Sequence, residues 1–500
     1  MITEDNLELF ADLEARIPVR DWTADGVRIW PLVRMLLAYR LALPQESRGG
    51  ATPSRWSLLG KRLGIAVDSI TAKVRDRRGA LPRVAEADAF ILTYAGARLA
   101  RLRDGHFDIF CGPILKALEK LSKKTQVWEF SYTQPYRFPR SGPSYAVQAS
   151  LFSILLKNRL LPSRAGQIHL PEYSLFRRSL EERQLYFPEL SETRIAREIS
   201  HIFRLRNLFE PALKRIRPRL VFTSNIGRYE FGLHLACHRL GIASVEVQHG
   251  VQAGNDGRYH GWTRVPQEGY SLLPQFYWSW DQKEADLINR WSAGCPPRHR
   301  AVVGGHPWVD YCRELGPEML DDFSARLLAE PADRKTALVT LQPPHLVSDT
   351  GQAIPEFVLE AMAREGASWR WWVRLHPSMG RDYASVEEML RRRGIRALVR
   401  EATEVPLFVL LRKADLHLTH SSTVVVEAQH FGVRSIVWSE FGAALFDEEI
   451  RSGYCRFAGT TETFLDAARK IMEEGRGRPA EQKAPAASAL QQLLEWSPAP

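Results

Sequence analysis

The chain has 500 residues, too many for one typical hydrophobic core, so two or three domains are expected. Hydrophobic residues make up 45% of the sequence and charged residues 25%, which excludes a mostly disordered chain, a collagen-like fibre and a coiled coil. Lysine and arginine number 68 against 58 aspartates and glutamates. The formal net charge of +10 favours an anionic partner: nucleic acid, an acidic membrane surface or a phosphorylated substrate.

The cysteines and the first segment indicate the compartment. Residues 1–20 are rich in acidic residues, unlike a signal peptide, and no stretch approaches the roughly 18 uninterrupted apolar residues of a spanning helix. We therefore expect a cytoplasmic protein. Scattered cysteines without a CxxC pair favour a reducing environment and argue against a disulfide framework or a zinc site: Cys111, Cys237, Cys295, Cys312 and Cys455.

Residues 1–85 are expected to form a helical, basic N-terminal extension. Residues 1–45 have a partly amphipathic helical pattern that includes Trp22 and Trp30, and residues 46–83 are basic. Two interpretations of the basic stretch remain open. It is a solvated linker, or it binds the anionic inner membrane while the tryptophans insert at the interface, which would make the protein peripheral to that membrane.

Between residues 86 and 299, short apolar stretches alternate with helical patterns, which indicates a parallel α/β sheet. Pro211 is expected to end or kink the long helix before it, because proline lacks a backbone N–H. Strands are predicted over 89–94, 127–130, 220–223 and 243–247, and helices over 113–120, 191–210 and 231–240.

A second unit of the same kind is expected over residues 300–475, followed by a linker and a short terminal helix over 476–500. The whole sequence predicts an α/β protein with two Rossmann-like doubly wound domains facing a cleft, with ligands beyond the carboxyl ends of the strands. In the second unit, strands are predicted over 301–303, 337–341, 371–375, 397–399, 416–418 and 435–438.

Hydroxyl side chains follow the predicted strand at 416–418. Ser421, Ser422 and Thr423 would start the next helix, where free N–H groups and the helix dipole favour a phosphate. Glu427 lies one turn further along, placed to accept hydrogen bonds from ribose hydroxyls. The alternative is that the hydroxyl residues only cap the helix.

A histidine and a proline, His376 and Pro377, follow the predicted strand at 371–375. Proline lets the loop turn sharply, and an imidazole can donate a hydrogen bond to a phosphate oxygen, with Arg374 adding positive charge. The alternative is a structural histidine in a turn. The sequence contains a second His-Pro pair at His306, so the dipeptide alone is weak evidence.

The last strong strand of the first unit ends at Gln248, His249 and Gly250. His249 would present an imidazole at the strand tip, suited to general base or electrophilic chemistry, and a structural role fits it equally well. Asp256 and Glu230 are candidates for a catalytic carboxylate, although a turn is the simpler interpretation of the loop around Asp256.

Together, His249-Gly250, His376-Pro377 and Ser421-Ser422 resemble motifs of GT-B glycosyltransferases of bacterial surface-polysaccharide synthesis. The pattern is similar to capsule or O-antigen Kdo transferases, bacterial sialyltransferases and CDP-glycerol glycerophosphotransferases, over roughly residues 215–440. The resemblance implies a GT-B fold, no metal or other cofactor, a cytidine nucleotide held by the second and third motifs, and catalysis by His249. The glycerophosphotransferases usually carry tryptophan where this chain has Gln248.

The resemblance implies transfer of a Kdo- or sialic-acid-like sugar from a CMP-activated nucleotide-sugar donor to a bacterial surface glycan or lipid-linked acceptor. The alternatives are a CDP-glycerol glycerophosphotransferase, a UDP-sugar-dependent GT-B enzyme, an enzyme like the shorter UDP-GlcNAc 2-epimerases, and a catalytically silent GT-B scaffold. A nucleic-acid-binding protein is a further class, disfavoured because the basic residues are dispersed and no HTH, RRM or KH signature occurs.

Overall fold

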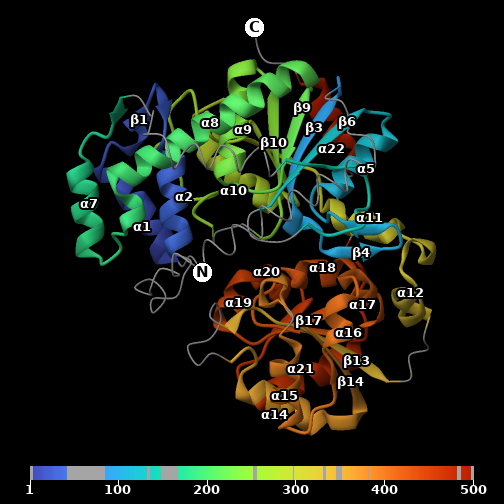
Figure 1. Cartoon of the computed structure of the whole chain (residues 1–500). Helices are drawn as coiled ribbons and strands as arrows, with labels where there is room; N and C mark the ends of the chain where they lie inside the picture. Colours follow the sequence, from blue (N-terminus) through green and yellow to red (C-terminus); the bar gives the residue numbers. More distant parts are fainter. Residues whose placement is uncertain are drawn as a thin grey trace. The chain divides into compact units, whose positions relative to one another are not determined.

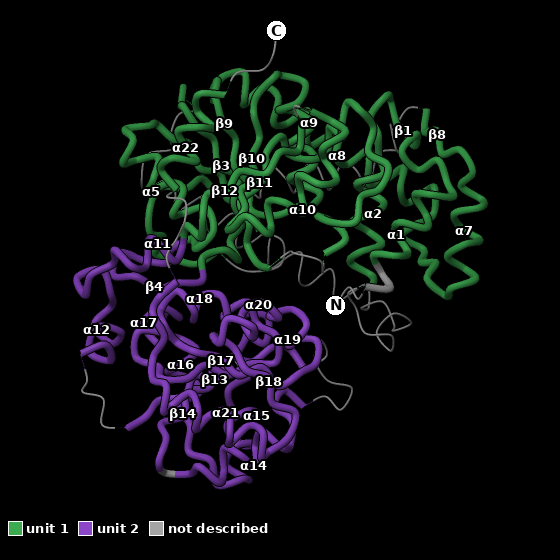
Figure 2. The backbone as a smooth tube through the Cα atoms, turned by 180° about the vertical axis from the view of Figure 1, so that it is seen from behind, with its two compact units in different colours: residues 1–98, 108–307, 483–500 green, residues 99–107, 308–482 purple. Residues whose placement is uncertain are grey.

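The computed structural model describes residues 4–41, 85–131, 136–147, 167–251, 256–296, 298–329, 334–344, 352–380, 382–480 and 486–496. The chain divides into two compact units (Figures 1 and 2). Unit 1 comprises Met1–Arg98, Asp108–Pro307 and Lys483–Pro500, and unit 2 comprises Leu99–Phe107 and Trp308–Gln482. The basic stretch at 46–83 lies outside the described residues, so its membrane contact stays a prediction.

Unit 1 is built on a seven-stranded sheet in which all paired strands are parallel, in the order β12-β11-β10-β9-β3-β6-β7. The order reverses between β3 and β9, which makes this position the topological switch point of a Rossmann-like sheet. The strands are β3 (Ala89–Tyr94), β6 (Thr125–Phe130), β7 (Tyr145–Ala146), β9 (Leu220–Thr223), β10 (Ala243–Val247), β11 (Phe276–Ser279) and β12 (Arg300–Val303).

Both faces of this sheet are buried, because successive strand residues point to opposite sides. Ile91 and Phe222 pack with α5 and α22 on one face, and Phe90 and Val221 pack with α8 and α9 on the other. Figure 1 shows α22, close to the C-terminus, beside α5. The helices are α5 (Gly112–Lys120), α8 (Glu192–Ile216), α9 (Arg228–Leu240) and α22 (Ala486–Glu495).

The long helix α8 continues past Pro211, so the expectation that it ends there is wrong. Leu213 and Ile216, beyond the proline, lie in the apolar cluster that covers β3 and β9. Burial of these side chains offsets the backbone hydrogen bond that proline removes.

The N-terminal helices α1 (Glu4–Arg16) and α2 (Trp30–Leu41) belong to the core of unit 1, where they share one apolar cluster with α8 and α9. Trp22 and Trp30 are fully buried, with ring centroids 6.0 Å apart. Trp22 also lies 4.9 Å from Phe176. The interpretation that these two tryptophans insert into a membrane is therefore wrong, because their rings already pack inside the protein.

A buried ion pair joins the N-terminal helices to the rest of unit 1. Arg34 of α2 contacts Glu14 of α1, and both side chains are almost completely buried. Arg34 also donates hydrogen bonds of 2.5 Å to the carbonyl oxygens of Gly257 and His260, and Glu14 accepts one of 2.6 Å from the Thr263 backbone N–H. The pair therefore fixes the polar loop after β10 against both helices.

Unit 2 contains a second parallel sheet, in the order β15-β14-β13-β16-β17-β18. Numbered along the chain, this is the 3-2-1-4-5-6 order of a Rossmann sheet, with its switch point between β13 and β16. The strands are β13 (Lys335–Thr340), β14 (Trp369–Arg374), β15 (Ala397–Leu398), β16 (Leu416–Thr419), β17 (Arg434–Val437) and β18 (Cys455–Phe457).

The helices of unit 2 cover its sheet in the same manner. Trp371 and Val373 of β14 and Leu418 of β16 form an apolar core with α14, α15 and α21. The helices named below are α14 (Glu356–Glu365), α15 (Tyr383–Arg391), α16 (Arg400–Glu404), α18 (Val424–His430), α19 (Glu440–Leu445) and α21 (Thr461–Glu474).

The limits of the units differ from the domain limits expected at residues 300 and 476. β12 is the edge strand of the unit 1 sheet, with Val302 in its apolar core. A hairpin of β4 (Ala100–Leu102) and β5 (Gly105–Phe107) leaves unit 1 and joins unit 2, where Phe107 stacks on Tyr311 at 4.7 Å. Segments distant in sequence therefore complete each core.

The predicted α/β class with two Rossmann-like doubly wound sheets is confirmed. The switch point of unit 2 lies at strands whose following loops carry candidate site residues, whereas in unit 1 His249 follows β10, which neighbours the switch-point strand β9. None of the helices in the described ranges has the length and apolar character needed to cross a lipid bilayer.

Arg34→Met should lower the thermal unfolding midpoint of the protein, because Glu14 would keep a buried carboxylate without its cation. Removing one partner of a buried ion pair typically costs about 3–5 kcal/mol. Arg16→Met is the matched control, since Arg16 pairs with Asp12 at the surface and such pairs contribute about 0–1 kcal/mol. Calorimetry should show a large decrease in the unfolding midpoint for Arg34→Met only. Equal midpoints for Arg34→Met and the parent would contradict the conclusion that the buried ion pair stabilises unit 1.

Candidate functional site

Three adjacent strand ends define the candidate site of unit 2. Arg374 of β14 pairs in register with Thr340 of β13, which pairs in turn with Thr419 of β16. Neighbouring strands lie about 4.8 Å apart, so the ends of β14 and β16 lie roughly 10 Å apart with β13 between them. The candidate residues that follow these three ends, at the switch point, are His376, Gln342 and Ser421.

Gln342, which the sequence analysis missed, holds the start of the loop after β16. Its Oε1 accepts hydrogen bonds from the Ser421 backbone N–H at 3.1 Å and from Ser421 Oγ at 3.0 Å. Thr419 Oγ1 donates to the Thr340 carbonyl oxygen at 2.8 Å, so two contacts tie the ends of β13 and β16 together. The sequence does place Gln342 directly after a predicted strand. However, only the strand order shows that it lies next to Ser421.

His376 lies on the exposed surface just after β14. Its Nδ1 accepts a hydrogen bond from the Ser378 backbone N–H at 3.2 Å and lies 2.8 Å from Ser378 Oγ. Because a backbone N–H can only donate, Nε2 carries the proton of the neutral ring. Desolvation lowers the pKa of His376, so this neutral form dominates at pH 7 and offers one N–H to a ligand.

Within the loop after β16, several N–H groups already have acceptors. The Ser422 N–H donates to Thr419 Oγ1 at 3.4 Å, and the Val424 N–H donates to Ser422 Oγ at 3.3 Å. In the described part of the chain, the Thr423 N–H has no acceptor. The serines therefore shape the loop, and Thr423 supplies its open backbone donor.

Arg374 and Glu427 form the charged part of the unit 2 site. Arg374 Nη1 donates to the carbonyl oxygens of Ala402 and Val405, at 2.7 and 2.5 Å, and so holds the segment around α16. Burial lowers the pKa of Arg374 to about 10, and the charge of Glu427 opposes this effect. Burial raises the pKa of Glu427 to about 7 against the attraction of Arg374, so Glu427 changes charge near neutral pH.

In unit 1, His249 follows β10 as predicted, and its ring is partly exposed. Ring centroids of Phe110 and Tyr259 lie 5.9 and 6.4 Å away, and the buried Nδ1 has no hydrogen-bond partner among the described residues. Burial lowers the pKa of His249 to about 4, the charge of Arg258 acts in the same direction, and the charge of Asp256 opposes it. The imidazole is therefore neutral at pH 7.

Asp256, a candidate for a catalytic carboxylate, is paired with Arg258 through both oxygens. Oδ1 accepts from Arg258 Nε at 2.9 Å and Oδ2 accepts from Nη2 at 2.5 Å. Burial alone would raise the pKa of Asp256, but the charge and hydrogen bonds of Arg258 outweigh it and hold the pKa below its ordinary value. Arg258 also donates to Tyr39 Oη at 3.1 Å, so the pair attaches the loop to α2.

Glu230, the other candidate carboxylate, lies in the first turn of α9 with only 1% of its surface exposed. It lies close to the end of β3. Burial raises the pKa of Tyr94 there, and the charges of Asp108 and Glu230 add to the increase. Glu230 thus lies near the switch point of unit 1.

A second buried carboxyl group, Glu246 of β10, was not anticipated from the sequence. Its Oε1 accepts a 2.5 Å hydrogen bond from Tyr259 Oη, whereas the buried Oε2 has no partner in the part of the chain that the structure describes. In the sheet, Glu246 lies in register between Thr223 of β9 and Tyr277 of β11. Burial raises the pKa of Glu246 to about 8, so this group is protonated at pH 7.

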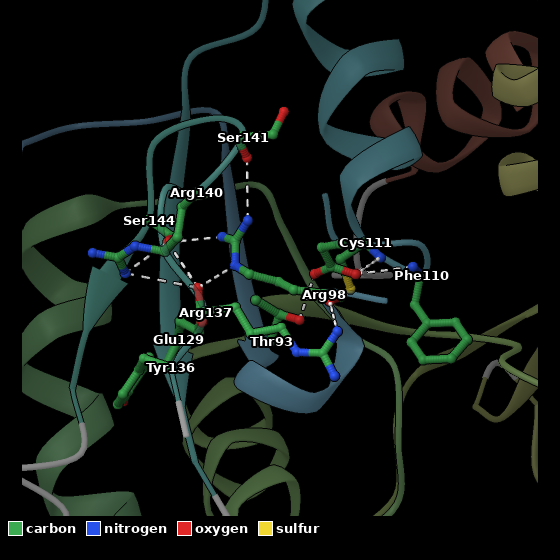
Figure 3. A network of polar contacts seen from close by, with 11 residues as sticks. Thr93, Arg98, Phe110, Cys111, Glu129, Tyr136, Arg137, Arg140, Ser141 and Ser144 are labelled. Carbon is green, nitrogen blue, oxygen red and sulfur yellow. Dashed lines mark hydrogen bonds and ion pairs between the residues drawn. The ribbon is translucent and has the colours of Figure 1, made fainter. Parts of the chain in front are cut away.

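A buried arginine network lies beyond the carboxyl ends of β3 and β6 (Figure 3). Arg98, just after the first 3₁₀ turn that follows β3, donates through Nε to Glu129 Oε2 at 2.8 Å and through Nη2 to Ser144 Oγ at 2.9 Å. Ser144 Oγ donates to Glu129 at 2.8 Å, and Arg140 approaches the same carboxylate at 3.8 Å. Burial raises the pKa of Glu129 and the charge of Arg98 opposes this, so the network fixes β7 and its loop against β6.

Next to this network, the Asp108 carboxylate holds the turn that precedes α5. Its Oδ2 accepts from Thr93 Oγ1 at 2.6 Å, and Oδ1 accepts from the backbone N–H groups of Phe110 and Cys111 at 2.9 and 3.0 Å. The aspartate therefore joins the end of β3 to the turn that leads into α5.

Over the described ranges, His, Cys, Asp and Glu side chains do not gather in groups of three or more that could hold a metal ion. The arrangement in unit 2 provides hydrogen-bond donors and one titrating carboxyl group at a switch point. The arrangement in unit 1 provides a neutral imidazole and a neutral carboxyl group.

These observations define an α/β protein with two Rossmann-like sheets and polar residues beyond the carboxyl ends of both. No protein family and no curated protein matches the chain. Among solved structures it is similar to the UDP-GlcNAc 2-epimerase from Neisseria meningitidis bound to UDP-GlcNAc, with 12% identity, a TM-score of 0.48, and coverage of 81% of this chain and 98% of that one.

Two further solved structures are similar to a comparable or lower degree. The UDP-GlcNAc 2-epimerase from Methanocaldococcus jannaschii has 14% identity, a TM-score of 0.48 and coverage of 81% and 98%. Acinetobacter baumannii MurG has 12% identity, a TM-score of 0.40 and coverage of 81% and 95%. Likeness at this level assigns neither an activity nor a ligand to this chain.

Glu246→Gln should remove a pH dependence of stability. The folded protein keeps a proton on Glu246 that the unfolded chain loses near the ordinary glutamate pKa of 4.5. The stabilisation is complete below that pH and is lost as the pH rises to about 8, so the variant should gain stability relative to the parent between about pH 5 and pH 8. Thermal midpoints across this range test it. Glu462→Gln, at an exposed glutamate, is the control. If the midpoints of Glu246→Gln and of the parent changed with pH in parallel, the prediction would be contradicted.

Proposed function

We propose that the protein is a metal-independent GT-B glycosyltransferase. It transfers a Kdo- or sialic-acid-like sugar from a CMP-activated donor to a bacterial surface glycan or a lipid-linked acceptor. The observation that carries the proposal is the set of residues at the switch point of unit 2, where Gln342, His376 and the loop from Ser421 to Glu427 lie at neighbouring strand ends. Switch points are where doubly wound sheets bind nucleotides.

The chemistry of these groups suits a nucleotide. The His376 Nε2–H and the Thr423 N–H are neutral donors that fit phosphate oxygens. Ser421 and Ser422 hold the loop that carries Thr423, and Arg374 positions the segment around α16. Glu427, when ionised, accepts hydrogen bonds from ribose hydroxyls.

In unit 1, His249 is the group proposed to act in the chemical step. A general base must be unprotonated at the working pH, and the lowered pKa of His249 meets this condition. Asp256 is an anion held by Arg258, and its charge favours the protonated form of His249, so we propose that it stabilises the protonated ring electrostatically. Glu230 is the second candidate carboxylate near the unit 1 switch point.

Thermal-shift screening with CMP, CDP, UDP and GDP tests the donor class, because a ligand that binds only the folded state raises the unfolding midpoint by mass action. The largest shift is expected with CMP. A larger shift with CDP would favour the glycerophosphotransferase alternative, and a larger shift with UDP would favour a UDP-sugar enzyme. No shift with any nucleotide would overturn the proposal.

Glu427→Gln should weaken CMP binding while leaving the fold intact. A charge-assisted hydrogen bond contributes about 1.5–3 kcal/mol, and glutamine retains a neutral acceptor, so a loss of about tenfold in affinity is expected. Glu462→Gln, an exposed glutamate of the same unit, is the matched control. Calorimetric titration measures both variants, and unchanged affinity in Glu427→Gln would refute the ribose role.

His249→Ala should lower turnover by about 10²–10⁴-fold, the usual contribution of general acid–base catalysis, with CMP affinity near that of the parent. His376→Ala should instead weaken CMP binding, because it removes a donor to phosphate. The exposed His169→Ala serves as a control for both variants. Loss of CMP binding in His249→Ala with turnover preserved at saturation would reverse the two roles.

A further inference from the structure

His420 lies directly after β16, and its Nδ1 faces two serine hydroxyls. Nδ1 is 2.9 Å from Ser421 Oγ and 3.3 Å from Ser439 Oγ. Ser439 follows the neighbouring strand β17 and caps α19 by accepting from the Gly442 N–H at 2.9 Å. The imidazole therefore bridges the ends of two adjacent strands, and both serines fix its orientation.

The single hydrogen of each serine hydroxyl is already donated elsewhere. Ser439 Oγ donates to the His420 carbonyl oxygen at 2.8 Å, and Ser421 Oγ donates to Gln342 Oε1 at 3.0 Å. Both oxygens therefore face Nδ1 as acceptors, so Nδ1 carries the ring proton and Nε2 holds a lone pair. Burial lowers the pKa of His420 to about 4, which keeps the ring neutral at pH 7.

The backbone beside His420 is packed too closely to permit another arrangement. A Cβ atom added to Gly442 would lie 2.2 Å from the His420 carbonyl oxygen. Glycine alone lets α19 approach the end of β16 this closely. The position of Ser439, and with it the tautomer of His420, is thus built into the fold.

The two imidazoles at this edge consequently have opposite tautomers. His376, beyond β14, presents an N–H because its Nδ1 accepts from a backbone N–H. His420, beyond β16, presents a lone pair because its Nδ1 donates to two hydroxyls. A phosphate oxygen fits the first ring and is repelled by the lone pair of the second.

From this geometry we infer that His420 Nε2 forms a hydrogen-bond-accepting subsite, which takes a hydroxyl or amino group of the bound nucleotide sugar. The inference rests on the proposed function and adds a residue to its site. The ring is partly exposed, and within the described residues no group donates to Nε2. The ligand would place its anionic group toward His376 and a neutral donor toward His420.

His420→Asn is the informative variant, because the asparagine amide retains a donor where Nδ1 lies and lacks any group in the place of Nε2. Its thermal midpoint should stay near that of the parent. Its affinity for CMP-N-acetylneuraminic acid should fall about 3–10-fold, the value of one neutral hydrogen bond. His169→Asn, at an exposed histidine of unit 1, is the control.

Comparison with CMP identifies the source of the neutral donor. Equal losses for CMP and for the CMP-sugar would place it on the nucleoside, and a loss for the CMP-sugar alone would place it on the transferred sugar. Both results support the subsite. Parent-like affinity of His420→Asn for both ligands would overturn it.

Long-range ¹H–¹⁵N spectra of histidine-labelled protein give a readout that needs no nucleotide. We expect the Nδ1–H tautomer for His420 and the Nε2–H tautomer for His376, with signals assigned from His420→Asn and His376→Ala. An Nε2–H tautomer at His420 would overturn the inference even if nucleotides bind. Failure of the parent to bind any nucleotide would overturn the proposed function, while the tautomer would still decide whether His420 presents an acceptor.

Discussion

The reversal of strand order is the constraint on which the unit 2 site and the position of Glu230 in unit 1 depend. In unit 1 the order reverses between β3 and β9, and in unit 2 between β13 and β16. Crossover connections are right-handed, so the helices that follow the two central strands lie on opposite faces of the sheet. In unit 1 these helices are α5 and α9, which pack on different faces. The carboxyl ends of the central strands are therefore left uncovered, and polar side chains can gather there.

The sequence was sufficient to locate most strands of the two parallel sheets, although β7, β11 and β18 were not predicted, and with them several candidate residues. Apolar runs at 89–94, 220–223 and 243–247 coincide with β3, β9 and β10, because buried parallel strands are continuously apolar. His249 and Ser421 therefore lie beyond strand ends, as expected. Strand order is not encoded in any local pattern, so the importance of Gln342 beside Ser421 could not be recognised.

Residues that act through tertiary contacts were missed for the same reason. Arg98 and Glu129 lie 31 positions apart, and Glu14 and Arg34 belong to different helices, so neither pair forms a motif. One of the two interpretations placed Trp22 at a membrane surface, because an amphipathic pattern is the same whether its apolar face meets lipid or a protein core. Only the packing partners distinguish the two, and here they include Phe176.

The two interpretations offered for Ser421 and Ser422, capping residues or site residues, are not exclusive. Their hydroxyls and N–H groups hydrogen-bond within the loop and to Gln342, as capping residues do. Those same bonds also arrange the neighbouring side chains, since Ser421 Oγ, which donates to Gln342, lies 2.9 Å from His420 Nδ1. A structural role for the serines thus defines the chemistry of the neighbouring groups.

In unit 1, burial reverses the usual order of two proton affinities. A glutamate ordinarily loses its proton before a histidine does, whereas here the pKa of Glu246 is raised to about 8 and that of His249 is lowered to about 4. Tyr259 lies between them, donating to Glu246 and packing edge-on against His249. At neutral pH both groups are uncharged. The negative charge that raises the pKa of His249 is that of Asp256, which is paired with Arg258. A proton taken up by His249 would therefore be stabilised by the charge of a carboxylate that is already fixed in place.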